Sequence, residues 1–451
     1  MDETLVGAIL RNHRIQRRLT QHELARMSSI SVRAIRDIEL GRSQQPRRQT
    51  IRLIADGLGL TGRERASFEE AAGLSVANDD LKEIYRSYLI APPFPLETMI
   101  SRCAEISALT RALASGEQRL VNITGLTGTG KTRFALETAN ILHDDYRFTV
   151  LWRSADPRYP TPAMRLDLSP LTNIINNGLE RLNHVTCESV AALATVIGDH
   201  ATLMVLDKEA TSQAQSDNVM RLLRECENLR VITTTGPLGI RGEQTLALPP
   251  LETPTRPHTH NPLSLSQFAA VQLLTSYARQ VRADFRLTAE NAQAICLLTQ
   301  YVDGIPAALE ALASWLLIYE PEVLKYRADR DLFSLLESPP DPESTFAIQK
   351  SLHEAIEALE SPERALLEML IDKASSWSVN EVATSTAQDT ILCARLVRVL
   401  LAKGLIRSVG GWGPPHFQVL NLVRRWYRWP DDLPISEYWL AGVTTLGDPI
   451  S

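Results

Sequence analysis

The first seventy residues carry apolar side chains at helical spacing, interrupted by residues that favour the ends of helices. We expect five short helices there, over residues 4–18, 21–27, 32–40, 49–58 and 63–72. Thr20 followed by Glu23 is a capping-box pattern for the second helix. Ser31 caps the third, which ends at Gly41. The pattern therefore predicts a small all-α domain over residues 1–73, which we call the head.

Apolar side chains of these helices provide a small core, and arginines gather on the outside. The first helix has a loose apolar stripe and the next two share a core, through Leu5, Ile9, Ile15, Ala25, Ile30, Ile35 and Ile38. The spacing turns Arg33, Arg36 and Asp37 outward. The head holds 13 arginines and no lysine against 9 acidic residues. This charge pattern favours nucleic-acid binding, with a protein-binding helical module as the alternative.

Beyond the head the pattern changes to apolar runs that predict buried strands. These runs cover 120–124, 146–152, 203–207 and 229–233, with helical patterns such as 133–142 between them. Strands that alternate with helices predict a parallel sheet. Prolines at 92, 93 and 95 lie in a segment, 74–97, that we expect to be a linker.

Residues 125–132, with the sequence GLTGTGKT, match the phosphate-binding pattern GxxxxGK[ST] between a strand and a helix. The glycines let backbone N–H groups turn toward phosphate oxygens, and the helix N-terminus adds its positive dipole end. We expect Lys131 to reach the β and γ phosphates of ATP, and Thr132 to bind Mg²⁺ together with Asp207. The expected nucleotide-binding residues of the motif are Gly125, Thr127, Gly128, Thr129, Gly130, Lys131, Thr132 and Arg133.

Composition places the chain among ordinary globular proteins. It has 451 residues, a net charge of −6 and 22% charged residues, which fits two to four domains. No apolar run is long enough for a membrane span, and no secretory signal is visible. Five scattered cysteines without a CxxC pair favour a reducing, cytoplasmic location. The head has a net positive charge, and the net negative charge of the chain comes from the residues beyond 73. We therefore expect only the head to meet DNA.

The head resembles the phage-repressor (XRE) family of helix-turn-helix domains, through the run LTQHELARMSSISVRAIRDIELGRSQQPRRQTIRLIADGLGL. The resemblance implies that the 32–40 helix lies in the major groove of DNA. It implies base contacts by Val32, Arg33 and Asp37, with Arg36 nearby. It implies DNA-backbone contacts or capping by Gln21, Ser31, Arg42, Arg47 and Arg48. It also implies a structural ion pair between Arg14 and Glu39.

The body resembles the NB-ARC branch of the STAND ATPases over about 98–430. Six ordered runs carry the resemblance: ISRCAEISAL, GLTGTGKTRFALETA, LMVLD, VITTTGPLGIRGEQTLALPPL, DGIPAALEALASWL and HFQVLNLVRRWY. The resemblance implies a P-loop domain (98–263), a helical subdomain (264–344) and a winged helix (345–430), followed by an irregular tail (431–451). It implies Arg102 near the adenine and Pro306 against the base or ribose. It also implies a closed ADP form and an open, oligomeric ATP form.

Two residues depart from that family. Gly236 stands where its sensor strand usually ends in an arginine that touches the γ-phosphate. Lys208 follows Asp207 where Asp or Asn is common, so that Lys208 would pair with Asp207 or face solvent. Glu209 is then the nearby carboxylate able to polarise a water. We therefore expect slow ATP hydrolysis or none.

The sequence predicts a multidomain chain, with an all-α helix-turn-helix head, an α/β P-loop domain with a parallel sheet, a helical subdomain and a winged helix. The favoured function is a DNA-binding transcriptional regulator, homo-oligomeric and controlled by ATP or ADP with Mg²⁺. One alternative is a STAND signalling or defence scaffold. Another is a constitutive regulator whose P-loop domain does not hydrolyse ATP. Arg424, Arg425 and Arg428 leave open a second DNA contact at the winged helix, although the resemblance implies a clamp there.

Overall fold

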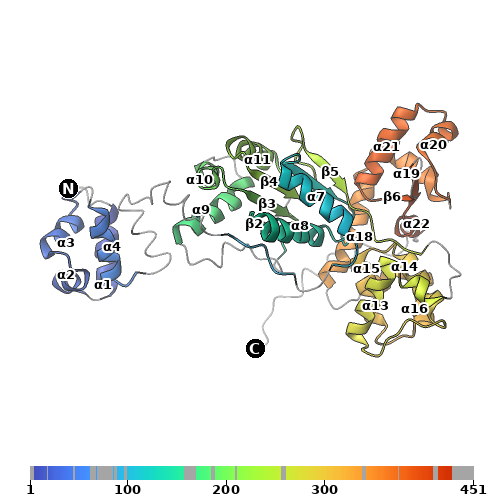
Figure 1. Ribbon diagram of the computed structural model, residues 1–451, viewed down its shortest axis with the longest axis horizontal. Coiled ribbons are helices and arrows are strands. Elements are labelled where there is room, and N and C mark those ends of the chain that lie inside the picture. The colour runs from blue at the N-terminus through green and yellow to red at the C-terminus, as the bar shows by residue number, and fades with distance from the viewer. Residues whose placement is uncertain are drawn as a thin grey trace, which may run out of the picture. The chain divides into compact units, whose positions relative to one another are not determined.

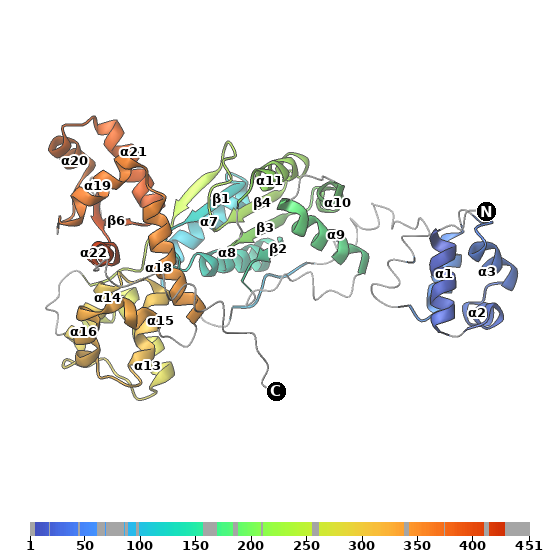
Figure 2. The same ribbon diagram turned by 180° about the vertical axis from the view of Figure 1, so that it is seen from behind.

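The computed structural model of the chain is shown in Figures 1 and 2. It describes residues 5–17, 19–43, 46–60, 68, 85, 89–95, 99–156, 169–183, 188–208, 211–254, 261–337, 342–373, 375–409 and 415–428. The chain divides into two compact units. The first unit holds residues 1–98, 102–123 and 132–245, and the second holds 99–101, 124–131 and 246–451.

The described part of the head is all helical. Its helices are α1 (Leu5–Gln16), α2 (Gln21–Ser28), α3 (Val32–Glu39) and α4 (Arg48–Gly57). They enclose a core of their own that includes Leu10, Leu24, Ile35, Ile54 and Phe68. The expected helix over 63–72 lies outside the described residues, apart from Phe68 itself. This is the helical head that the sequence predicts.

One residue of the apolar stripe expected in the first helix lies outside the core of the head. Ile15 is 56% exposed, and the buried stripe of α1 runs through Val6 and Leu10 instead. Residues four apart share one face of a helix, whereas Ile15 lies five positions beyond Leu10 and turns away from it. Ile9 packs at the edge of the core as expected.

The α/β part of the first unit is built on a parallel sheet. Its strands are β1 (Leu120–Thr124), β2 (Thr149–Ser154), β3 (Thr202–Asp207), β4 (Leu229–Thr233) and β5 (Gln244–Ala247), in the order β2-β3-β4-β1-β5. The pairs β2–β3, β3–β4 and β4–β1 are parallel, with Ser154 opposite Asp207. The sequence predicts β2 over 146–152, but Tyr146 still belongs to the preceding helix.

Helices surround this sheet (Figure 1). They are α7 (Cys103–Ser115), α8 (Lys131–Tyr146), α9 (Ser169–Glu180), the 3-10 turn η2 (Arg181–Asn183), α10 (Glu188–Ile197) and α11 (Gln213–Glu225). Tyr85 and Ile90, from the segment expected to be a linker, are buried in the same core. The Tyr85 hydroxyl lies 3.0 Å from the Thr202 hydroxyl, and the carbonyl of Ile90 accepts from the N–H of Val150. Tyr85 and Ile90 are therefore packed into the core of the sheet, whereas Phe94 of the same segment is exposed.

Residues 262–337 of the second unit form six helices that share one apolar core. They are α12 (Pro262–Leu265), α13 (Ala269–Val281), α14 (Ala292–Tyr301), α15 (Pro306–Trp315), α16 (Pro321–Arg330) and α17 (Leu332–Glu337). Proline at the first position of α12, α15 and α16 starts these helices where a backbone N–H has no partner in any case. The core of these helices continues into the elements that follow.

Those elements combine helices with a β-hairpin. They are α18 (Pro342–Glu357), α19 (Ser361–Ile371), α20 (Val379–Thr386), α21 (Thr390–Ala402), β6 (Ile406–Val409), β7 (His416–Val419) and α22 (Asn421–Tyr427). Strands β6 and β7 are antiparallel, and Trp377 adds a bridge to Phe417. The tail over 431–451 lies outside the described residues. Among the helices described, none has the length and apolar character needed to cross a membrane.

Candidate functional site

The phosphate loop, residues 125–132, consists of the turn after β1 and the first two residues of α8. Gly125, Gly128 and Gly130 have φ values of 138°, 86° and 94°, a region that side chains with a Cβ disfavour. A Cβ on Gly128 would lie 2.9 Å from the Cβ of Ala307, so this position also needs glycine for lack of space. The spacing of glycines in the motif is thus a backbone requirement of the turn.

Within the second unit, polar groups of the phosphate loop bond to the loop itself and to its neighbours. The Lys131 ammonium donates to the carbonyls of Gly125 (2.9 Å) and Leu126 (3.1 Å). The buried Thr129 hydroxyl also donates to Leu126. The N–H of Thr127 donates to the Ser351 hydroxyl of α18 at 3.2 Å. The loop is therefore held in a compact turn, with its lysine folded over its own carbonyls.

Asp207 ends the central strand β3 and is the most buried carboxylate among the described residues of the first unit. It is 0% exposed. One of its oxygens accepts from the hydroxyls of Thr132 (2.7 Å) and Thr234 (2.8 Å), and the other accepts from Ser154 (2.7 Å). These partners come from the start of α8 and from the ends of β2 and β4. We call this group the carboxylate site, and it gathers at the carboxyl edge of the sheet as parallel strands require.

Of the two alternatives expected for Lys208, pairing with Asp207 is wrong. Its ammonium lies 2.8 Å from Asp156, a carboxylate just beyond β2, while its side chain is exposed, as the other alternative expects. The side chain of Asp156 is 5% exposed and that of Lys208 is 46% exposed. The pairing arises because β2 and β3 are neighbours in register, so the residues after their ends lie side by side. Glu209 lies outside the described residues.

Gly236 lies in an open place after β4. A Cβ built there would meet nothing nearer than the Thr211 hydroxyl at 3.9 Å. Its φ is not in the left-handed region, so the backbone does not demand glycine there. A Cβ therefore fits at the position where the sequence lacks an arginine.

The remaining expected nucleotide contacts lie at the starts of helices. Arg102 precedes α7 with φ 71°, and burial lowers the pKa of its guanidinium to about 10, against the opposing charge of Glu105. Arg133 pairs with Glu137 at 3.2 Å along α8. Pro306 is half-buried at the first position of α15. Among the described residues, no group of three or more His, Cys, Asp or Glu side chains is placed to bind a metal.

In the head, the expected reading face is built on α3. Arg33 is 92% exposed, and Asp37 lies 3.9 Å from both Arg33 and Arg42. Arg36 is exposed and Val32 half-buried on the same helix. The Ser31 hydroxyl caps α3 by accepting from Ala34 at 3.2 Å.

The expected phosphate contacts of the head differ in their surroundings. Arg42 and Arg47 are exposed between α3 and α4, and the side chain of Arg48 lies outside the described residues. Gln21 donates to Glu39 at 2.7 Å, and the Arg14–Glu39 pair is present at 2.6 Å. Glu39 has no sequence signal as a partner of Gln21, because the two lie 18 positions apart.

Residues 5–68 match the helix-turn-helix domain family. The chain is 31% identical over 302 residues to the uncharacterised protein Rv0894 of Mycobacterium tuberculosis, which covers 65% of this chain and 70% of that protein. The chain belongs to the same family as Rv0894.

Two more distant similarities were found. A second Mycobacterium tuberculosis protein, Rv0890c, bears the name of a candidate HTH-type transcriptional regulator and is 26% identical over 333 residues. The match covers 70% of this chain and 34% of Rv0890c, so the chain spans about a third of that regulator. A solved STAND protein with a tetratricopeptide repeat sensor, from Pyrococcus horikoshii, is 18% identical, with 75% of this chain and 43% of that chain covered. Its TM-score is 0.30, which is too low to support a conclusion about function.

Proposed function

We propose that the chain is a DNA-binding transcriptional regulator whose conformation or oligomeric state is set by bound ATP or ADP. The observation that carries the proposal is the carboxylate site, in which Asp207 accepts a hydrogen bond from Thr132, the last residue of the phosphate loop. A hydroxyl of this loop and a strand-end carboxylate are the pair that holds the magnesium of a bound nucleotide in P-loop proteins. The helix-turn-helix match over 5–68 supports the DNA-binding half of the proposal.

Magnesium fits the chemistry of the carboxylate site. The site offers hydroxyl and carboxylate oxygens, which are the ligands that Mg²⁺ prefers. Three hydroxyls donate hydrogen bonds to the two oxygens of Asp207. Thr132 and Asp207 would hold the ion, which would neutralise charge on the nucleotide phosphates. Two protein oxygens are enough, because Mg²⁺ keeps several waters and phosphate ligands.

The phosphates would bind over the loop itself. When a nucleotide binds, Lys131 would exchange its hydrogen bonds to two neutral carbonyls for hydrogen bonds to a charged phosphate. Hydrogen bonds between two charged groups are stronger than those to a neutral carbonyl. By resemblance, Arg102 lies near the adenine and Pro306 against the base or ribose. The glycines and threonines of the loop supply backbone N–H groups and the cradle.

The elements of the second unit that contact the loop would act as a clamp. The N–H of Ala307, next to Pro306, donates to the carbonyl of Gly128, and Ser351 accepts from Thr127. We assign these contacts to a helical subdomain (264–344) and a winged helix (345–430), which would report on the nucleotide bound by a P-loop domain (98–263). The hairpin β6–β7 with the Trp377 bridge supports the winged-helix assignment.

Hydrolysis at this site would be slow. The acidic position after Asp207 is occupied by Lys208, whose ammonium is committed to Asp156, and Gly236 supplies no cation. Developing charge on the γ-phosphate would therefore lack a stabilising group. The change Gly236→Arg tests this directly, because a Cβ at this position meets no close contact. We expect it to raise phosphate release at least tenfold, and Gly236→Gln serves as the uncharged control. A wild-type rate near 1 s⁻¹ or faster, about that of ordinary enzymes, would contradict slow hydrolysis.

The head would read DNA through α3. Arg33→Ala should relax sequence preference and cost about 1–3 kcal/mol of binding free energy. Arg47→Ala should weaken all sequences alike and reduce the salt slope by about one. Quantitative binding to duplexes selected from a random library distinguishes the two. Identical behaviour of both variants would contradict the assignment of α3. Two or more heads in a homo-oligomer would raise affinity through effective concentration.

The decisive experiment measures DNA binding by the full chain with ATP, ADP or no nucleotide. Lys131→Ala removes the phosphate contact, and Lys325→Ala on α16 is the matched control. We expect DNA affinity to change with nucleotide in the wild type and the control but not in Lys131→Ala. Equal affinity under all conditions would overturn nucleotide control and favour a constitutive regulator. Absence of specific DNA binding would overturn the regulator and favour a signalling scaffold.

A further inference from the structure

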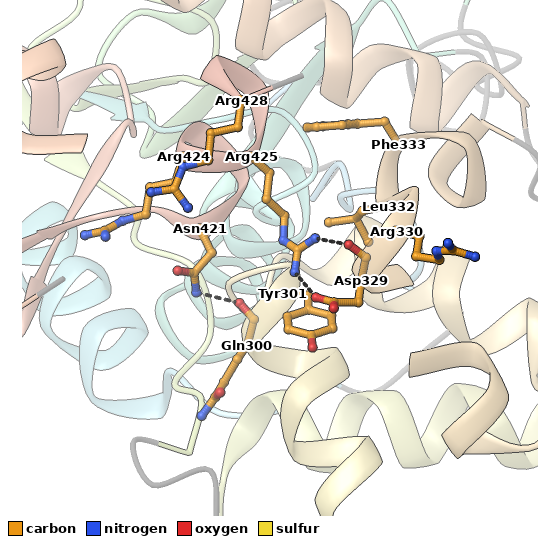
Figure 3. A pocket seen from close by; sticks show the side chains of 10 residues that line it. All are labelled: Gln300, Tyr301, Asp329, Arg330, Leu332, Phe333, Asn421, Arg424, Arg425 and Arg428. Carbon is orange, nitrogen blue, oxygen red and sulfur yellow. Dashed lines mark hydrogen bonds and ion pairs between the residues drawn. The ribbon is translucent and has the colours of Figure 1, made fainter. Parts of the chain in front are cut away.

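A cavity of about 560 Å³ in the second unit lies among α14, α16, α17 and α22. Figure 3 shows the side chains that line it. Among the described residues that line it, four are arginines and Asp329 is the one carboxylate, so this lining carries an excess of positive charge. We call it the arginine pocket. Its volume is within the range of small-molecule sites, roughly 300–1,000 Å³.

One wall of the arginine pocket is held rigidly. The guanidinium of Arg425 lies 4.3 Å from the ring centroid of Tyr301 and 3.1 Å from a carboxylate oxygen of Asp329. It also donates to the carbonyls of Ala328 and Asp329. A planar cation fixed on both a ring and a carboxylate is pre-organised, so ordering it costs a ligand little.

The opposite side of Arg425 carries two further cations, Arg424 and Arg428 (Figure 3). Arg428 lies 3.2 Å from Asp372, but their side chains are 67% and 86% exposed. Such an exposed pair contributes little and exchanges readily for a better partner. Arg424 donates to the carbonyl of Lys373 at 2.6 Å. Burial lowers its pKa, Asp303 and Asp372 raise it, and the charges of Arg428 and Arg407 lower it further. Among the described residues, Arg424 and Arg428 thus share Asp372 as a nearby anion, and the two cations lie close to each other.

The arginine pocket lies at the joint between α14 and α22. The side chain of Asn421 donates to the carbonyl of Gln300 at 2.8 Å, and the N–H of Leu422 donates to Asp303 at 2.8 Å. Asp303 directly precedes the turn that leads into α15. Any ligand that contacts both helices stabilises the arrangement in which α22 rests on α14.

We propose that the arginine pocket binds a small metabolite that carries two or more phosphate or carboxylate groups, and that this ligand is an input signal of the protein. Oxyanions match the guanidinium donors of Arg424 and Arg428, and the excess positive charge requires more than one anionic group. A concave site of this size suits a small molecule rather than a duplex. The proposal does not depend on nucleotide binding at the phosphate loop.

The test uses inorganic pyrophosphate as the probe and the full chain carrying Lys131→Ala, which removes the main cation of the phosphate loop. Calorimetry measures binding in this background, with Arg428→Gln as the test change and Arg398→Gln, on α21 outside the pocket, as the matched control. We expect saturable binding that Arg428→Gln weakens about tenfold or more and that Arg398→Gln leaves unchanged. Arg425→Lys keeps the charge but loses the planar contacts, so it should weaken binding severalfold.

Several outcomes would overturn the proposal. One is the absence of saturable binding, and another is equal affinity in the Arg428→Gln and Arg398→Gln variants. Binding that only the wild-type phosphate loop supports would place pyrophosphate there instead. A loss of duplex DNA affinity in Arg428→Gln without a loss of pyrophosphate affinity would assign these arginines to DNA. Equal unfolding temperatures of the two glutamine variants guard against misfolding, because Arg428 is largely exposed.

Discussion

The head and the carboxylate site satisfy their polar groups in different ways. In the head, the Thr20 hydroxyl accepts from the N–H of Glu23, and the Glu23 carboxylate accepts from the N–H of Thr20. Ser31 caps α3 through Ala34, again three positions along the chain. At the carboxylate site, the three hydroxyls that donate to Asp207 lie 75, 53 and 27 positions away.

The difference shows which interactions can be predicted from the sequence and which require the three-dimensional fold. A cap is complete within one helical turn, so its residue pattern is visible in the chain. A site at the edge of a parallel sheet is complete only when distant strands meet in register. Evidence of function therefore came from short motifs, and evidence of how the site is held came from the structure.

The largest expected effect tests whether the head is as local as its caps suggest. Glu39 accepts from Arg14 and Gln21, which lie 25 and 18 positions away. Glu39→Ala leaves Arg14 without its carboxylate, and we expect a loss of about 3 kcal/mol in the stability of the head. Hydrogen exchange of α1–α4 in the full chain measures it, with Glu39→Gln as the isosteric control. A loss below about 1 kcal/mol would mean that local signals alone hold the head together.

The next effect is a pH dependence in the second unit. Burial raises the pKa of Asp303 to about 6, while the charge of Arg407 and the N–H groups of Asn421 and Leu422 oppose the shift. The ordinary pKa of an aspartate is about 3.9. Between about pH 4 and pH 6, Asp303 is therefore protonated in the folded state and ionised in the unfolded state. Stability is therefore highest below this window and falls by about 2–3 kcal/mol as the pH rises through it.

Asp303→Asn should remove that dependence. Asn tolerates the left-handed backbone at this position, where φ is 53°. Its side-chain oxygen can still accept from Leu422. Urea unfolding at pH 4.5 and pH 7 measures the effect, and we expect the variant to gain relative to the wild type at the higher pH. The same difference between the two proteins at both pH values would refute the shift.

A smaller effect on the free energy of unfolding is expected at the Lys208–Asp156 pair, which could not be predicted from the sequence. Lys208→Ala removes the ammonium partner of a nearly buried carboxylate, but the lysine is half exposed, so we expect a loss of about 2 kcal/mol. A double-mutant cycle with Asp156→Ala isolates the coupling by urea unfolding. Additive single losses would show that the two side chains do not stabilise each other.

Particular elements show where sequence reasoning succeeds. The strands at 120–124, 203–207 and 229–233 are found because continuous apolar runs end in polar residues, and the structure places β1, β3 and β4 there. Helices α2 and α3 are found to within a residue because their caps are local. The expected phosphate loop coincides with the turn between β1 and α8.

The failures share a physical cause. Ile15 looks like part of an apolar stripe, yet which stripe faces the core depends on the helices packed against it. Lys208 could not be paired with Asp156 from the sequence, because the register of β2 against β3 decides which residues meet. The arginine pocket is likewise not evident from the sequence, since Arg425 and Asp329 come from helices almost a hundred positions apart.

The smallest effect compares the same cap chemistry in both regions. Thr20→Ala removes the cap of α2, and Ser212→Ala removes the cap of α11, where the Ser212 hydroxyl accepts from Gln215 at 3.1 Å. Each change should cost about 1 kcal/mol, because each removes the hydrogen bond to an N-terminal N–H of a helix. The Thr20 hydroxyl also donates to Glu23 at 2.8 Å, and the Ser212 hydroxyl donates to Asn183 at 3.4 Å. Hydrogen exchange should rise in the first turn of the altered helix only. Equal and confined losses mean that capping is local wherever it occurs, so the two regions differ only in their long-range bonds. A loss at Ser212 that spreads to β3 or β4 would mean that even a cap in the α/β part is tied to distant partners.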